Sequence, residues 1–304
     1  MDAVINQAFG DDWALYNGDC VEVVKGIPSG SVDLSVFSPP FSSVYTYSDS
    51  ERDMGNCASD DEFADHYRFL ARELLRITRP GRLCAVHCKD LVDYKGTSGR
   101  AGLRDFPALI RRVHEEEGWK YHSKVTIWKD PVIEMQRTKA HGLLYKQLRA
   151  DSTFSRQGMA EYVVILRKWP TGPDEESQVV PVTHTKSSFP LSQWQEWASP
   201  VWMTINQTKV LNVQQAREDR DEKHMCPLQL DVIERLVRLY SNAGETVFSP
   251  FAGIGSEGHG ALNAGRKFVG IELKPAYWRV GCANLGNARR QMGLFDDGSG
   301  VGYA

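Results

Sequence analysis

The chain has 304 residues, is 41% hydrophobic and 25% charged, and carries a formal net charge of −3. This composition is typical of a globular protein with room for one large α/β domain and an insertion. The weak negative charge excludes a generic binder of polyanions, so any contact with nucleic acid has to use a local basic patch. No apolar run approaches the ~18 residues of a membrane span, and the N-terminal residues lack the pattern of a signal peptide. We therefore expect a cytoplasmic protein without membrane contact.

The cysteines are scattered, at positions 20, 57, 84, 88, 226 and 282. Cys84 and Cys88 flank His87, but there is no Cys-x-x-Cys pair and no second cluster of ligands. We interpret the cysteines as reduced, buried thiols and predict no metal site.

Strands and helices alternate along most of the chain. Apolar runs predict strands at 13–16, 32–37, 83–87, 125–128, 162–166, 246–248 and 267–272. Apolar stripes predict helices at 60–79, beginning with Asp60 as N-cap, and at 105–117, 228–241 and 257–264. Residues 42–58 are polar and predict a loop, and 171–223 are rich in proline and tryptophan and predict an irregular insertion. This order predicts an α/β fold, with a mostly parallel twisted sheet and helices on both faces.

The stretch Ser38-Pro39-Pro40-Phe41 follows the predicted strand at 32–37 directly. Open α/β sheets place their sites at the carboxyl ends of strands. The two prolines hold carbonyl groups out rigidly, Ser38 offers a hydroxyl and Phe41 offers a flat apolar face. Such a site suits a planar base that stacks on Phe41 and donates its amine hydrogens to Ser38 and to the Pro39 carbonyl.

A second constellation begins with Ser249-Pro250-Phe251-Ala252-Gly253-Ile254-Gly255, between the predicted strand at 246–248 and a helix. The glycines permit positive φ and close approach of a ligand, and the helix start presents free N–H groups. Glu272 ends the next strand, about 20 residues on, where an acid reaches the hydroxyls of a ribose. Pro250 and Phe251 fit S-adenosylmethionine better than a dinucleotide.

Together these segments resemble a DNA amino-methyltransferase of the beta class, in which the proline-pair signature precedes the cofactor loop. Asn17-Gly18-Asp19 and the His- and Pro-containing segment 222–227 are similar to further segments of that family. Ser249 stands where the family has an aspartate that contacts the methionine part of the cofactor. The resemblance covers about 11–168 and 222–284. It implies a Rossmann-like S-adenosylmethionine methyltransferase fold, with a catalytic domain at 1–170 and 224–290, target recognition at 171–223 and a flexible tail at 291–304.

The resemblance also implies site-specific transfer of a methyl group from S-adenosylmethionine to an exocyclic amine of a base flipped out of double-stranded DNA. Adenine N6 stands narrowly ahead of cytosine N4 as the target. Ser38, Pro39, Pro40 and Phe41 are the predicted catalytic residues. The predicted cofactor-binding residues are Asp19, Cys20, Ser38, His224, Ser249, Pro250, Phe251, Gly253, Gly255 and Glu272. Alternatives that stay open are an RNA or protein-glutamine amino-methyltransferase and a catalytically dead, DNA-binding relative.

A basic patch lies at 134–157, where we predict that side chains contact DNA phosphates. The predicted DNA-binding residues are Arg137, Lys139, His141, Lys146, Arg149 and Arg156. A solvated basic helix is the alternative interpretation. The resemblance further implies a bacterial or phage-encoded protein of restriction-modification, and a homodimer and a separate restriction endonuclease are the partners to consider.

Overall fold

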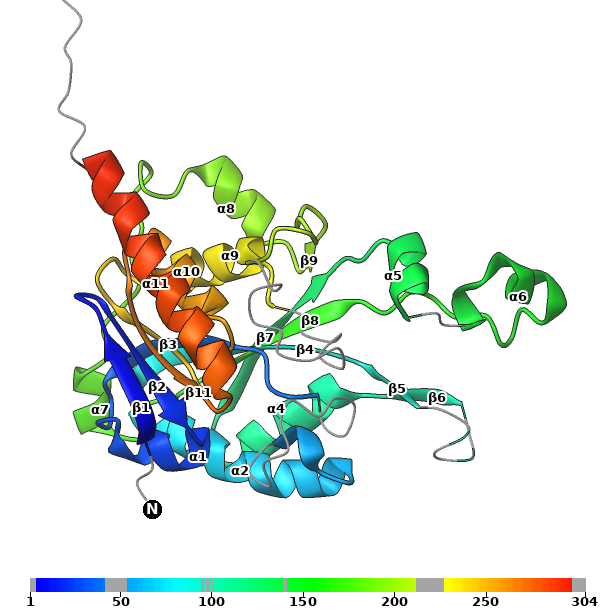
Figure 1. The fold of residues 1–304 in the computed structure, drawn as a ribbon, viewed down its shortest axis with the longest axis horizontal. Coiled ribbons are helices and arrows are strands. Elements are labelled where there is room, and N and C mark those ends of the chain that lie inside the picture. The colour runs from blue at the N-terminus through cyan, green and yellow to red at the C-terminus, as the bar shows by residue number, and fades with distance from the viewer. Residues whose placement is uncertain are drawn as a thin grey trace, which may run out of the picture.

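The computed structural model describes residues 4–41, 54–93, 96, 99, 101–138, 141–211 and 227–296. A nine-stranded sheet runs through the molecule in the order β1-β2-β11-β10-β3-β4-β8-β7-β9. Helices cover both of its faces (Figure 1). The five central strands β2, β11, β10, β3 and β4 are parallel to one another. Antiparallel pairs join β1 to β2, β8 to β4 and β7 to β8. The predicted α/β fold with a mostly parallel sheet is therefore confirmed.

The predicted strands are present, several of them longer than the apolar runs that indicated them. The strands of the large sheet are β1 (Val4–Phe9), β2 (Trp13–Gly18), β3 (Val32–Phe37), β4 (Thr78–Lys89), β7 (Lys120–Ile127), β8 (Glu161–Arg167), β9 (Val201–Trp202), β10 (Thr246–Ser249) and β11 (Lys267–Glu272). Every residue of β3 is buried, which explains its continuous apolar run. β1 is an edge strand that is exposed at most positions, so it has no such run and was not predicted.

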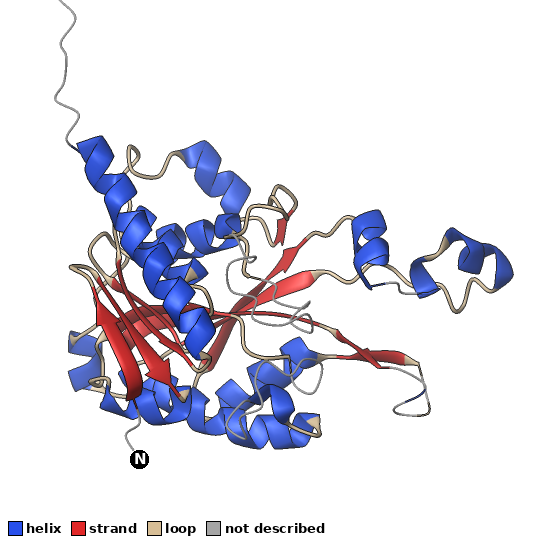
Figure 2. Cartoon of the chain, viewed as in Figure 1, coloured by secondary structure: helices blue, strands red, loops and turns tan. Residues whose placement is uncertain are grey.

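One face of the sheet is covered by α1 (Cys20–Val23), α2 (Asp60–Ile77) and α4 (Phe106–Glu116), and the other by α9 (Leu230–Tyr240), α10 (Ser256–Asn263) and α11 (Pro275–Asp296) (Figure 2). The N-cap of α2 is Ser59, whose Oγ accepts the N–H of Glu62 at 3.1 Å, so the prediction of Asp60 was wrong by one residue. The short 3-10 helix η3 (Met54–Asn56) precedes α2 within the predicted loop.

The helix α11 continues to Asp296, past residue 291 where we expected a flexible tail to begin. Among the described residues, no helix is long and apolar enough to cross a membrane.

The segment that we predicted as an insertion is described up to residue 211. It forms α7 (Pro173–Ser177), α8 (Leu191–Trp197) and β9, which pairs parallel with β7 and so extends the sheet. Trp197 and Trp202 are buried, and the Trp202 indole donates to the Trp197 carbonyl at 2.9 Å. Arg235 of α9 lies over both rings. Trp194 is 51% exposed. Of the three tryptophans, Trp197 and Trp202 therefore pack against α9 and Trp194 does not.

Two hairpin-like extensions project from the body on the same side (Figure 1). The first contains α5 (Pro131–Thr138), η4 (His141–Leu143) and α6 (Tyr145–Ala150), and it connects β7 to β8. We call it the arm. The second is the pair of short strands β5 (Leu91–Asp93) and β6 (Gly102–Arg104) between β4 and α4.

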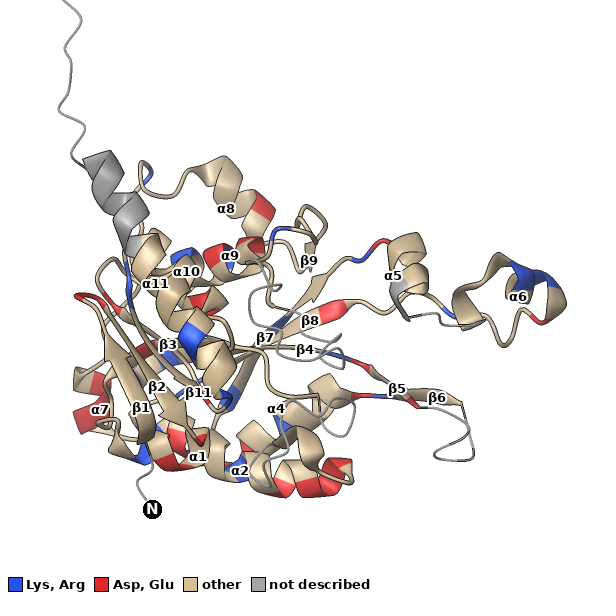
Figure 3. Ribbon diagram, in the orientation of Figure 1, with Lys and Arg blue, Asp and Glu red and all other residues tan. Residues whose placement is uncertain are grey.

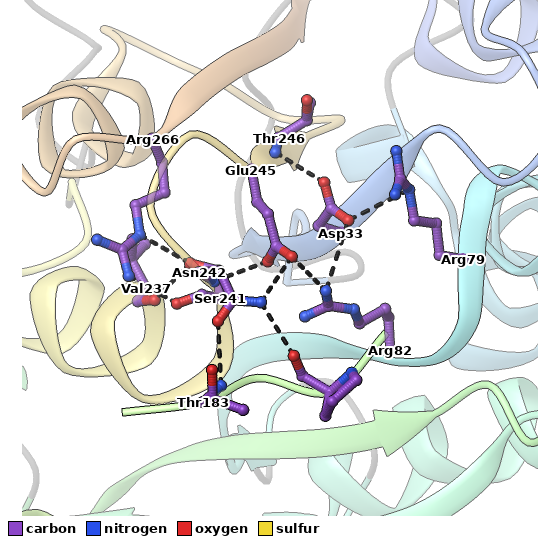
Figure 4. Close-up of polar contacts among 11 residues, drawn as sticks. Asp33, Arg79, Arg82, Thr183, Val237, Ser241, Asn242, Glu245, Thr246 and Arg266 are labelled. Atoms are coloured by element: carbon purple, nitrogen blue, oxygen red, sulfur yellow. Dashed lines mark hydrogen bonds and ion pairs between the residues drawn. The ribbon is translucent and has the colours of Figure 1, made fainter. Parts of the chain in front are cut away.

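A polar cluster around the buried Asp33 and Arg82 joins the amino ends of β3, β4 and β10 (Figure 4). The Asp33 carboxylate accepts the Thr246 N–H at 2.9 Å and pairs with Arg79 at 3.2 Å. Arg82 is bonded to Glu245, and a Glu245 oxygen also accepts the Asn242 N–H at 2.7 Å. Buried charges need partners of this kind. The cluster fixes β3 against β10, and thereby the loops that leave the opposite ends of these strands.

Candidate functional site

The carboxyl ends of five neighbouring strands meet at one edge of the sheet. In sheet order, Asp19 follows β2, Glu272 ends β11, Ser249 ends β10, Ser38 follows β3 and His87 lies near the end of β4. Because these strands are parallel, segments that are far apart in sequence come together there. Except for His87, these are residues that we predicted for the site.

The end of β3, which leads into the signature loop (38–41), contacts the glycine loop (249–255). Phe37 ends β3 and Phe251 follows β10, and their ring centroids are 5.8 Å apart at an interplanar angle of 53°. Pro39 is buried, and Ser38 and Pro40 are half-buried. The last residue of β3 is therefore packed against the loop after β10, and the signature loop starts from that contact.

Glu272 holds the glycine loop in place. Its carboxylate accepts the Gly253 N–H and the Lys274 N–H, each at 2.8 Å. The Asn17 amide donates to the carbonyls of Glu272 and Leu273, at 2.8 and 3.0 Å, which ties the end of β2 to the end of β11. A carboxylate can accept about four hydrogen bonds, so contact with a ribose is compatible with the two from Gly253 and Lys274.

The glycine loop has features that fit a polar ligand. Gly253 and Gly255 have φ of 53° and 84°, and a Cβ at Gly253 would meet nothing within 4 Å. Within the described part of the chain, the buried hydroxyls of Ser249 and Ser256 have no hydrogen-bond partner. Because unpaired buried hydroxyls are unfavourable, the residues beside the start of α10 fit a cofactor that supplies the missing bonds.

A further acid lies in the first turn of α10. Glu257 is buried, and burial raises the pKa of its carboxyl to about 8, with the negative charge of Glu272 adding to the effect. Acids in the first turn of a helix are usually exposed. The sequence therefore did not indicate Glu257 as a residue of the site.

Asp19 and Cys20 begin α1 beside the end of β11. Asp19 is the N-cap, and its side chain accepts the Val21 N–H at 3.0 Å. Cys20 is buried, and burial together with the charges of Asp19 and Glu272 raises the pKa of its thiol well above the ordinary value. Cys20 is therefore a neutral thiol, and the contacts of both residues with the cofactor stay predictions.

The Ser38 hydroxyl is part of a chain of polar side chains. Its Oγ lies 3.1 Å from His87 Nδ1 and 3.3 Å from the His87 carbonyl oxygen. His87 Nε2 lies 3.2 Å from a carboxylate oxygen of Glu161, which also pairs with Lys129. Sequence reasoning had noted His87 only as a neighbour of cysteines and had missed Glu161 and Lys129. The available signal was polar residues at the ends of otherwise apolar strands.

The Phe41 ring is less accessible than we expected. It is 9% exposed and packs edge-on against Phe106, with centroids 5.9 Å apart. The Lys89 ammonium lies 5.8 Å from the centre of the ring. Stacking of Phe41 on a base stays a prediction, and it requires one face of this ring to become accessible.

Part of the predicted DNA-binding patch is visible on the arm. Lys146 and Arg149 are exposed on α6, where Figure 3 shows basic residues. The half-buried Arg156 donates its backbone N–H to the Gly142 carbonyl at 3.0 Å. Arg137 lies in α5 and His141 in η4, but their side chains are outside the described part. Lys139 and His224 are outside the described residues altogether.

Known proteins share both sequence and fold with this chain. The DNA adenine methyltransferase YhdJ of Escherichia coli K12 is 24% identical over 272 residues, which are 89% of this chain and 82% of YhdJ. The type II methyltransferase M.BglII of Bacillus subtilis is 23% identical over 86% of this chain, and the match spans 66% of M.BglII, slightly under two thirds.

Among solved structures, TTHA0409 of Thermus thermophilus in complex with S-adenosyl-L-methionine has a TM-score of 0.63 and 22% identity, with coverage of 90% and 95% of the two chains. PvuII DNA methyltransferase, which is cytosine-N4-specific, has a TM-score of 0.58 and 15% identity, with coverage of 96% and 95%. At this identity the two structures establish a shared fold.

A family model for DNA methylases, the N6/N4 methyltransferases, matches residues 32–282. That range includes the signature loop, the glycine loop and Glu272. Because it also covers most of the chain, this protein belongs to the N6/N4 DNA methylase family of amino-methyltransferases.

Proposed function

We propose that this protein transfers a methyl group to an exocyclic amine of a base that is flipped out of double-stranded DNA, at a specific sequence. S-adenosylmethionine is the cofactor, and when bound it supplies the methyl group. The observation that supports this assignment best is the contact between Phe37 and Phe251. It joins the strand end that leads into the loop suited to a planar amine to the loop suited to the cofactor.

The signature loop would activate the amine by accepting its hydrogens. An aromatic amine is a weak nucleophile because its lone pair is delocalised into the ring. If the Ser38 Oγ and the Pro39 carbonyl accept the two N–H groups, they favour a pyramidal nitrogen whose lone pair is free. Positioning this nitrogen in line with the methyl group then supplies much of the acceleration. Asp19, Ser249 and Glu272 would hold the cofactor, with Glu272 facing its ribose.

The target base is proposed in order of preference. Adenine N6 comes first, narrowly, because adenine enzymes are the commoner members of the resembling family. Cytosine N4 is kept second because a serine at the first position of the signature, here Ser38, favours cytosine within that family. In either case the amine of a paired base is buried in the duplex, so the base has to flip out, at a cost of a few kcal/mol.

DNA would be held outside the catalytic edge. The basic residues of the arm, such as Lys146 and Arg149, would neutralise phosphates, and the segment 171–223 would read the sequence. We further propose the beta-class order, since the signature strand β3 precedes the cofactor strand β10 in the chain and lies beside it in the sheet. A homodimer and a separate restriction endonuclease are the proposed partners.

Transfer of labelled methyl groups tests this function. The full chain is incubated with S-adenosylmethionine labelled in its methyl group and with duplex DNA, RNA or a glutamine-containing protein in separate reactions. We expect label in DNA alone, and digestion to nucleosides then gives N6-methyladenine or N4-methylcytosine. Label in RNA or protein alone would replace the proposal. Binding of DNA without any transfer would indicate a catalytically dead relative.

A further inference from the structure

We propose that His87, oriented by Glu161, is a positioning residue that holds the Ser38 hydroxyl with its proton turned inward and its oxygen lone pairs facing the target amine. This inference rests on the proposed function, because it assigns a cause to the geometry of the residue that would receive the amine. It concerns residues of β4 and β8 that lie outside both sequence motifs.

The first link of the chain joins two neighbouring strands. Ser38 follows β3 and His87 lies near the end of β4, and the strands are parallel with Phe37 opposite Val86. Ser38 Oγ reaches both His87 Nδ1, at 3.1 Å, and the His87 carbonyl oxygen, at 3.3 Å. Both partners belong to His87 of the neighbouring strand. The hydroxyl proton therefore has two acceptors on β4, and a bond to either one turns it away from the rim of the sheet.

The second link fixes the imidazole ring. Glu161 begins β8, which pairs antiparallel with β4. One of its carboxylate oxygens lies 3.2 Å from His87 Nε2 and 2.6 Å from the Lys129 ammonium. The same oxygen accepts from the Gln229 amide at 3.3 Å. His87, Lys129, Glu161 and Gln229 are all buried. The carboxylate is thus held by groups from β4, from just after the end of β7 and from the N-cap of α9.

The charge of this carboxylate sets the direction of the hydrogen bonds. Burial opposes ionisation of Glu161, but the hydrogen bond from His87 and the positive charge of Lys129 outweigh it and lower the pKa of the carboxyl. An ionised carboxylate only accepts hydrogen bonds, so His87 donates through Nε2. When the imidazole is neutral, its other nitrogen is an acceptor, and Nδ1, 3.1 Å from Ser38 Oγ, then receives the proton of Ser38.

The outcome at Ser38 is chemical as well as geometric. A hydroxyl has one proton and two lone pairs. When the proton is committed to His87, the oxygen can only accept from a substrate, which is what an amine hydrogen requires. A freely rotating hydroxyl could instead donate to the nitrogen lone pair and withdraw it from reaction. One hydrogen bond contributes about 1 kcal/mol, and a barrier higher by about that amount slows a reaction roughly tenfold. We therefore expect removal of the His87 imidazole to slow methyl transfer by about tenfold.

A double-mutant cycle separates this role from simple packing. The variants are His87→Ala, Ser38→Ala and the pair, each compared with the wild type in single-turnover methyl transfer to duplex DNA. Rates are expressed per cofactor-binding molecule, counted by calorimetric titration with S-adenosylmethionine. We expect His87→Ala to slow transfer about tenfold when Ser38 is present and less than twofold when it is absent. Cofactor affinity in His87→Ala should stay within about twofold of the wild type.

Further variants sharpen the result. His87→Asn places an amide oxygen near the position of Nδ1, so it should recover part of the rate lost in His87→Ala. Glu161→Gln should slow transfer because an amide group no longer dictates which imidazole nitrogen carries the proton. His114 is also fully buried, and its Nδ1 is bonded to the Ile110 carbonyl on α4. His114→Asn is thus the matched control and should leave the rate unchanged.

The outcomes are distinct. Equal slowing by His87→Ala with and without Ser38 overturns the inference, as does a wild-type rate in His87→Ala. A wild type that binds the cofactor but transfers no methyl group to duplex DNA overturns the proposed function, and the inference with it. Tenfold slowing that requires Ser38, with partial recovery in His87→Asn, establishes it.

Discussion

Phe37 and Phe251 pack against each other with ring centroids 5.8 Å apart, although they come from opposite halves of the chain. Each ring adjoins a residue of chemical interest, Ser38 after Phe37 and Ser249 shortly before Phe251. Because β3 and β10 are adjacent and parallel, with Val247 opposite Leu34, the contact is part of the core. The proposed amine site and the proposed cofactor site are therefore held at a fixed separation by packing.

The first prediction concerns the signature loop. Ser38→Ala combined with Pro39→Ala should abolish methyl transfer, because the amine loses one acceptor and the carbonyl that accepts its second hydrogen loses its rigid support. Binding of S-adenosylmethionine should remain, and calorimetry measures it. Pro28→Ala with Ser31→Ala is the matched control at the other end of β3, where the Ser31 hydroxyl donates to the Pro28 carbonyl. Wild-type turnover by the Ser38 and Pro39 variant would refute the site assignment.

The second prediction concerns cofactor affinity. Glu272→Ala removes the acceptor of the Gly253 and Lys274 N–H groups and the proposed partner of the ribose. Affinity for S-adenosylmethionine should fall by about 1 kcal/mol or more, measured by calorimetry. Glu22→Ala changes a partly exposed acid on α1 that pairs with Lys25 and should leave the affinity unaltered. An affinity in Glu272→Ala equal to that of the wild type would count against the ribose role.

Much of the fold and the core of the site follow from local sequence. β3 and β11 were predicted with the bounds that the structure has, because a fully or largely buried strand has a continuous apolar run. Ser38, Ser249 and Glu272 could be placed at one edge because parallel strands end there. β1 and β9 were missed because one is largely exposed and the other is two residues long.

The remaining site residues depend on tertiary pairing. His87, Lys129 and Glu161 come from three separate strands or their ends, and no local pattern indicates that β4 pairs antiparallel with β8. Glu257 has the sequence context of an exposed acid in a first helical turn, whereas packing of α10 buries it. Such residues are found only once the elements are arranged in space.

The third prediction concerns stability at the imidazole network. Glu161→Gln should destabilise the fold by about 3 kcal/mol at pH 7, because Lys129 loses its buried partner. The lowered pKa of Glu161 in the fold means that its contribution is present above the ordinary value of 4.5 and is lost as pH falls below it. Urea unfolding at several pH values measures this. A stability difference between wild type and variant that does not shrink in acid would contradict the assignment of an ionised Glu161.

The fourth prediction concerns the arm. Lys146→Ala with Arg149→Ala removes two exposed charges from α6. Binding to duplex DNA should weaken, and the slope of log affinity against log salt should fall by roughly 1 for each phosphate that the variant no longer neutralises. Fluorescence anisotropy over a salt series measures both. Lys120→Ala at the start of β7, the end of that strand far from the arm, is the control. An unaltered slope in the arm variant would move the DNA-binding surface elsewhere.

The last prediction concerns Glu257. Burial raises the pKa of this carboxyl to about 8, so the fold favours its protonated form. The contribution to stability is fully present below the ordinary pKa of 4.5 and is lost as pH rises through about 8. Glutamine resembles the protonated acid. Glu257→Gln should therefore match the wild type at pH 5 and exceed its stability at pH 9, by on the order of a few kcal/mol. Urea unfolding at both pH values measures the difference. Glu176→Gln, at an exposed acid of α7, should follow the wild type at both, and a Glu257→Gln variant that does the same would show that the carboxyl ionises freely in the fold.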